Sequence, residues 1–124
     1  PEEARITPIP VGEDLSSLSA ILMDNDYYHF TIEHSLLEYE VHIANIESLI
    51  CLKSKAFLDL SQRKAIGESV DSKHIAKHKK DIFRLAAMLT PASKYELPDT
   101  LKADVGNFCT AIMQALSSRQ DLVM

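Results

Sequence analysis

The fold is decided by residues 45–90, which read NIESLICLKSKAFLDLSQRKAIGESVDSKHIAKHKKDIFRLAAMLT. Apolar residues recur every three or four positions in both halves of this stretch, which predicts two amphipathic helices. The first spans roughly residues 46–66 and ends at Gly67, and the second spans roughly 72–90 and ends before Pro91. So short a connection predicts that the two helices are antiparallel neighbours.

The segment before the helix pair changes its pattern three times. Residues 1–13 hold three of the five prolines and are expected to form an extended connector, and residues 14–23 a short helix. From residue 27 to 33 apolar and polar residues alternate, which predicts a strand. A turn near residues 34–36 and a second strand over 37–43 complete the expected hairpin.

The segment after Pro98 predicts a last amphipathic helix. Its apolar residues at helical spacing are Leu101, Val105, Phe108, Ile112 and Leu116. The fold class predicted is α+β: mostly α-helical, with three to four helices, an antiparallel helix pair in the middle and a two-stranded antiparallel hairpin near the N-terminus. The chain 1–124 is expected to be a single domain, with a connector (1–13), a short helix and hairpin (14–44) and a helical bundle (45–124).

Several observations suggest a piece of a longer protein in a reducing compartment. The chain begins without methionine, and a two-stranded sheet is marginal unless other elements complete it.

The two cysteines, Cys51 and Cys109, are too few for a disulfide framework, which favours the cytoplasm. No apolar run approaches the roughly 20 residues of a membrane span. With a net charge of −5, the chain lacks the basic excess of domains that bind nucleic acid by neutralising phosphates.

Lys53 and Asp81 are the residues that stand out for chemistry. Lys53 falls near the centre of the apolar arc of the first helix, so its ammonium must reach solvent by snorkelling, enter a cleft or pair with an anion. Asp81 flanks the apolar stripe of the second helix and could meet Lys53 across the pair. One interpretation is an interhelical salt bridge. The other is a polar site for a phosphate-bearing ligand, with Lys53 as the point charge and Asp81 holding it in place.

Other polar patterns are weaker signals. His74 and His78 are four residues apart and could bind a metal, although the intervening positions lack the Glu of a zincin motif. The basic run 73–80 is typical of a solvated helix face but could meet a phosphate backbone. Glu38 and Glu40 are expected on one face of a strand, where alternating acids are usually only solvated.

Four stretches resemble a known family. They are VHIANIESLICLKSKA (residues 41–56), LDL (58–60), VDS (70–72) and KHKKDIFRL (77–85). Together they resemble the later part of bacterial nucleotidyltransferase-like proteins of the AbiEii/AbiGii toxin family, and the resemblance extends from about Leu18 to Leu89. It implies an active-site lysine at Lys53 and a basic-Asp motif at Lys80 and Asp81. Lys53 and Lys80 would bind the nucleotide, and Asp81 would be the catalytic residue that orients Lys53.

The resemblance also implies what this segment lacks. In the family a Gly-Ser or Gly-Gly turn precedes paired carboxylates that hold magnesium, and nothing in residues 1–44 matches it. A Mg²⁺ cofactor is therefore expected only with a missing N-terminal part, and the fragment alone is expected to be inactive. Arg84 also stands near the position where the family commonly has a second acid.

Two hypotheses follow. The first is the C-terminal portion of a toxin-like nucleotidyltransferase that transfers a nucleotide from an NTP to an RNA or protein acceptor and is held by an antitoxin. The second is a non-catalytic helical module that binds a protein partner through residues 73–80 or the last helix. In either case an exposed hairpin edge could pair with another copy to form a homodimer.

Overall fold

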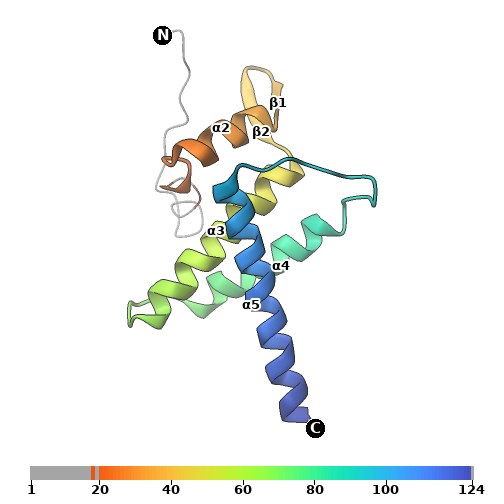
Figure 1. The fold of residues 1–124 in the computed structure, drawn as a ribbon. Helices are drawn as coiled ribbons and strands as arrows, with labels where there is room; N and C mark the ends of the chain where they lie inside the picture. Colours follow the sequence, from red (N-terminus) through yellow and green to blue (C-terminus); the bar gives the residue numbers. More distant parts are fainter. Residues whose placement is uncertain (1–17, 19, 124) are drawn as a thin grey trace.

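The computed structural model of the protein describes residue 18 and residues 20–123. Its elements in chain order are α2 (Asn25–Glu33), β1 (Ser35–Glu38), β2 (Val41–Ala44), α3 (Ile46–Ala65), α4 (Ser72–Ala86) and α5 (Asp99–Val123). The predicted fold class is confirmed: the chain is mostly helical, and one antiparallel hairpin precedes a pair of long helices (Figure 1). The expected connector and most of the expected helix over 14–23 lie outside the described residues.

The strand predicted over residues 27–33 is wrong, because these residues belong to helix α2. Asp24 begins this helix: its Oδ1 accepts hydrogen bonds from the backbone N–H groups of Asp26 (2.9 Å) and Tyr27 (3.3 Å). Tyr27, Phe30 and Thr31 are buried on one side of the helix. Their spacing of three and four residues fits a helix, although the same stretch also alternates in polarity.

The hairpin exists, but its strands lie at other positions than predicted. Strand β1 pairs antiparallel with β2, with Ser35 opposite Ala44 and Glu38 opposite Val41. The expected turn at 34–36 is wrong, since the chain reverses at Tyr39 and Glu40, both of which have positive φ (49° and 62°). Two successive positive φ angles are typical of the tight turn that suits the twist of a two-stranded hairpin.

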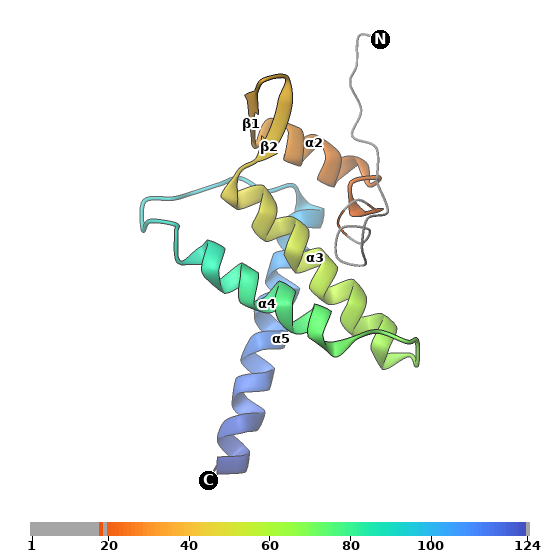
Figure 2. The same ribbon diagram turned by 180° about the vertical axis from the view of Figure 1, so that it is seen from behind.

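Helices α3 and α4 form the predicted antiparallel pair, which Figures 1 and 2 show from opposite sides. Gly67 ends α3 as predicted, with φ of +97°. Its N–H donates to the carbonyl of Lys64 (3.1 Å), and that of Glu68 donates to the carbonyl of Arg63 (2.9 Å). This is the Schellman arrangement of a helix end. Helix α4 ends at Ala86, earlier than the predicted Thr90.

The core lies where α2, α3 and α5 meet. Its buried members are Ile21, Tyr27, Phe30, Cys51, Leu52, Ala56 and Leu101. The hydroxyl of Tyr27 donates a 2.7 Å hydrogen bond to Asp104 Oδ2 on α5, and the hydroxyl of Thr100 donates one of 2.8 Å to Asp26 Oδ2. These two hydrogen bonds fix α2 against α5. The second half of α5 extends beyond the other described elements in both views (Figures 1 and 2).

No helix in the described part of the chain is both long enough and apolar enough to cross a lipid bilayer.

Candidate functional site

The structure brings Lys53 and Asp81 together across the helix pair. Lys53 extends from α3, and its Nζ donates a 3.0 Å hydrogen bond to Asp81 Oδ2 on α4. The side chains are 16% and 22% exposed, so the ion pair sits at the border between the core and the solvent. In this position the methylene chain of Lys53 is buried with the apolar residues of α3, and its ammonium is neutralised by the Asp81 carboxylate.

Asp81 also lines a shallow groove along the exposed side of α4. The groove has a volume of about 290 Å³, and its lining residues are Lys73, Ala76, Lys77, Lys80, Asp81 and Arg84. The four basic residues are separated by four, three and four positions, so they follow one another along a single face of the helix. Lys80 and Asp81, predicted from the basic-Asp motif, therefore share a groove whose other charged groups are cationic.

This arrangement favours an anion and opposes a cation. A phosphate group in the groove would meet Lys80 and its basic neighbours. Lys53 does not line the groove itself and is connected to it through its hydrogen bond to Asp81. Magnesium does not fit the same residues. Asp81 is the only carboxylate among the described residues that line the groove, and its Oδ2 already accepts a hydrogen bond from Lys53. A divalent ion there would lie among several positive side chains, whereas Mg²⁺ is usually bound through carboxylates and phosphates.

The alternative metal ligands are the pair His74 and His78 and the pair Glu38 and Glu40. His78 is fully buried on the same side of α4 as Ile82, while His74 is only partly buried. Glu38 ends strand β1, but Glu40 lies in the turn, so the prediction that the two acids share a strand face is wrong. Across the described part of the chain, no group of three or more His, Cys, Asp or Glu side chains could hold a metal ion.

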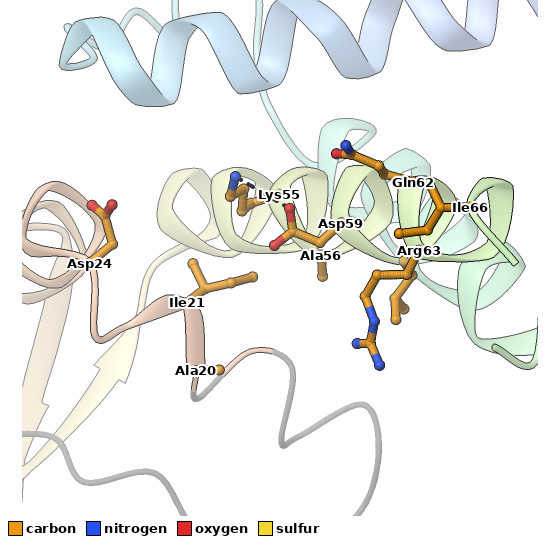
Figure 3. A pocket seen from close by; sticks show the side chains of 10 residues that line it. Ala20, Ile21, Asp24, Lys55, Ala56, Asp59, Gln62, Arg63 and Ile66 are labelled. Carbon is orange, nitrogen blue, oxygen red and sulfur yellow. Dashed lines mark ion pairs between the residues drawn. The ribbon is translucent and has the colours of Figure 1, made fainter. Parts of the chain in front are cut away.

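A larger cavity lies away from the Lys53–Asp81 pair. It has a volume of about 510 Å³ and is drawn in Figure 3. The residues that line it are Ala20, Ile21, Asp24, Lys55, Ala56, Asp59, Leu60, Gln62, Arg63 and Ile66. Within it Lys55 Nζ lies 3.3 Å from Asp59 Oδ1 on the same helix. None of the predicted site residues lines this cavity, so its size alone does not make it the site.

Sequence reasoning missed a second polar contact, between His34 and Glu47. His34 Nδ1 lies 2.8 Å from Glu47 Oε2, and the His34 ring stacks on Phe30 with centroids 3.9 Å apart. Burial alone would raise the pKa of Glu47, but hydrogen bonds from His34, from its own backbone N–H and from the Asn45 side chain outweigh burial and lower that pKa below its ordinary 4.5. The contact joins the end of α2 to the start of α3, and no spacing in the sequence signals it.

Two buried groups in the core are held neutral. Burial, reinforced by the hydrogen bond to Asp104 and its negative charge, raises the pKa of Tyr27 far above 10.0. Burial, with smaller effects from Asp104 and Glu47, raises the pKa of the Cys51 thiol to about 12. A thiol that stays protonated is a poor nucleophile, so Cys51 is a packing residue.

Comparison of the chain with protein-family models, with curated proteins and with solved structures finds no match.

Proposed function

We propose that the chain is the C-terminal, ligand-holding portion of a toxin-like nucleotidyltransferase that transfers a nucleotide from an NTP to an RNA or protein acceptor. The observation that supports this most is the contact between Lys53 and Asp81, at 3.0 Å, beside a groove lined by basic residues. These are the positions at which the sequence resembles the AbiEii/AbiGii toxin family, and their chemistry suits a triphosphate.

Each residue has a separate task in this proposal. Lys80 attracts the triphosphate at the groove, and Lys53 contributes a point charge from the neighbouring helix. Asp81 acts on Lys53: by accepting its hydrogen bond, the carboxylate restricts the rotamers of a long side chain, so that less entropy is lost when phosphate binds.

The reaction itself needs groups that these residues do not supply. Nucleotidyl transfer requires magnesium to neutralise the phosphates and a base to activate the acceptor hydroxyl. Because the groove does not fit a magnesium ion, the metal would have to be held by carboxylates other than those at this site. The described residues bind and orient the triphosphate, and this chain alone is expected to transfer nothing.

The first experiment measures binding of a fluorescent NTP analogue to the chain by anisotropy. Lys53→Ala and Asp81→Ala are each expected to weaken binding about 10-fold or more, which corresponds to the loss of one hydrogen bond to a charged group. Lys55→Ala and Asp59→Ala are matched controls, since they remove an ion pair of the same residue types that lies within α3. The controls are expected to bind like the wild type.

The Asp81 variant separates the two interpretations of the ion pair. If Asp81 only neutralises Lys53, Asp81→Ala frees the ammonium and strengthens phosphate binding. Stronger binding would therefore contradict an orienting role for Asp81, and unchanged binding in both variants would rule out the site. Thermal unfolding of each variant identifies any loss of binding that comes from misfolding.

A second experiment tests transfer with the natural polypeptide that carries this segment. It is incubated with each α-labelled NTP and magnesium, and label on RNA or protein is counted. Loss of labelling in Lys53→Ala and Asp81→Ala, with the controls active, is expected. Labelling that persists in both variants would remove them from the reaction.

The alternative function is a non-catalytic helical module that binds a protein partner. One observation favours it: the hairpin carries large apolar side chains that are half exposed or more. They are Leu36, Leu37, Tyr39, Val41 and Ile43. If the module is correct, no NTP binds, and a partner protects the hairpin or the last helix from hydrogen exchange.

A further inference from the structure

Helix α5 continues well past the part of it that is packed. Leu101 and Phe108, in its first half, are buried against the rest of the chain. From Met113 to Ser118 every residue is exposed. This half of the helix lies outside the body of the described chain in both views (Figures 1 and 2).

The middle of α5, from its packed part into its exposed part, is unusual in composition. Residues 105–118 contain no Asp, Glu, Lys or Arg, although a quarter of the whole chain is charged. A solvated helix normally carries charged residues on its exposed side. Here Met113 is 65% exposed and Leu116 49% exposed, and with Ile112 they continue at helical spacing the stripe that Val105 and Phe108 begin. An apolar stripe on a projecting helix is typical of an interaction surface.

An isolated helix end also needs a partner for its own stability. Short helices without tertiary contacts are marginal in water, and the β-branched and hydroxyl residues Thr110, Ile112, Ser117 and Ser118 are weak helix formers. Packing against another surface would supply the missing stabilisation.

We propose that this stripe, Ile112, Met113 and Leu116 with the flanking exposed Cys109, is where two copies of the chain associate, helix against helix, across a two-fold axis. In such an interface each surface must be complementary to itself. Most surfaces of an acidic chain would place like charges opposite each other, which is unfavourable. Residues 105–118 meet themselves without any charge, and the polar residues at their flank can donate and accept hydrogen bonds with an identical copy.

The stripe is small for an interface between two proteins. A few turns of one helix bury less than the roughly 1,200 Å² that marks the low end of stable interfaces. The dimer is therefore expected to be weak and reversible.

Sedimentation equilibrium over a range of concentrations tests the proposal. A reductant is present so that Cys109 cannot form a covalent dimer. The wild type is expected to pass from monomer to dimer and no further, and Met113→Lys with Leu116→Lys is expected to raise the dissociation constant at least 10-fold because two like charges per copy then face each other.

Two further variants control for charge and for other surfaces. Met88→Lys places one of the two added charges at a methionine of nearly equal exposure, 64%, and Leu37→Lys changes the apolar hairpin. Both are expected to dimerise like the wild type. A wild type that stays monomeric at millimolar concentration, assembly beyond the dimer, or a dimer weakened by Leu37→Lys and not by the α5 variant would each overturn the proposal.

Discussion

Lys53 and Lys55 show how position on a helix decides what a lysine does. Lys55 pairs with Asp59 one turn further along α3, the kind of surface contact that contributes about 0.3–0.5 kcal/mol. Lys53 instead pairs with a residue of another helix and is less exposed. Removing Asp81 would leave a largely buried ammonium without that acceptor, a change that typically costs about 1–3 kcal/mol. The two pairs are therefore expected to differ in how much they stabilise the fold.

Also at the scale of a residue, Glu47 makes the free energy of unfolding depend on pH. Its pKa is lowered in the folded state, so its contribution to the free energy of unfolding is fully present above its ordinary pKa of 4.5 and is lost as pH falls through the folded value. Glu47→Gln is expected to be less stable than the wild type at pH 7, by about 1–2 kcal/mol, because a charged acceptor is lost. The difference should shrink as the pH drops below 4.5, as measured by urea unfolding.

The exposed Glu33, at the end of α2, serves as the control for this measurement. Glu33→Gln should leave the pH profile close to that of the wild type. If the gap between Glu47→Gln and the wild type grew at low pH, the sign of the pKa shift would be wrong.

At the scale of an element, the two turn residues of the hairpin are of types that rarely adopt the backbone conformation found there. Tyr39 and Glu40 both have positive φ, a conformation that costs most residues about 1–2 kcal/mol each. Asn followed by Gly is the favoured pair for such a turn. Tyr39→Asn with Glu40→Gly is therefore expected to raise the free energy of unfolding by about 1 kcal/mol, seen as a higher urea midpoint with an unchanged slope.

Glu38→Gly is the matched comparison, because Glu38 is in strand β1 and lacks a positive φ. This variant should lose stability, since glycine weakens a strand. Loss of stability in the Asn-Gly variant as well would show that the turn does not control the hairpin.

The two described glycines, Gly67 after the end of α3 and Gly106 inside α5, should respond in opposite ways to alanine. A methyl group at Gly67 or at Gly106 would meet no atom within 4 Å, so the backbone alone decides the effect. Gly67→Ala should cost about 1 kcal/mol because φ is +97° there. Gly106→Ala, inside α5, should gain about 0.5–1 kcal/mol from higher helix propensity. Thermal unfolding of both variants measures the difference, and a shift of the same sign in both would contradict this account.

At the scale of the whole molecule, charge is distributed unevenly. The chain carries a net charge of −5, yet the exposed face of α4 carries a row of basic residues and the second half of α5 carries no charge up to Ser118. The core formed by α2, α3 and α5 keeps these two surfaces on separate helices. In our two proposals an anionic ligand binds the first surface and a second copy of the chain binds the other, so binding at one would leave the other free.

Much of the helical structure could be predicted from the sequence, because its signals are local. Apolar periodicity and Gly67 were enough for α3 and for the beginning of α4, and the stripe after Pro98 was enough for α5. The residues 27–33 were assigned wrongly because they satisfy both a two-residue and a three-to-four-residue period. The contact of Tyr27 with Asp104 and the cap at Asp24 favour the helix over a strand.

The sequence by itself determined the helix pair, its antiparallel order and the placement of Lys53 and Asp81 on facing sides, because these depend on spacing along one helix at a time. Only the tertiary structure decided that the two side chains meet, that Asp81 shares a basic groove with Lys80, and that His34 reaches Glu47. Those outcomes depend on the rotation and separation of one element relative to another, which the packing of the whole core sets and which no local pattern encodes.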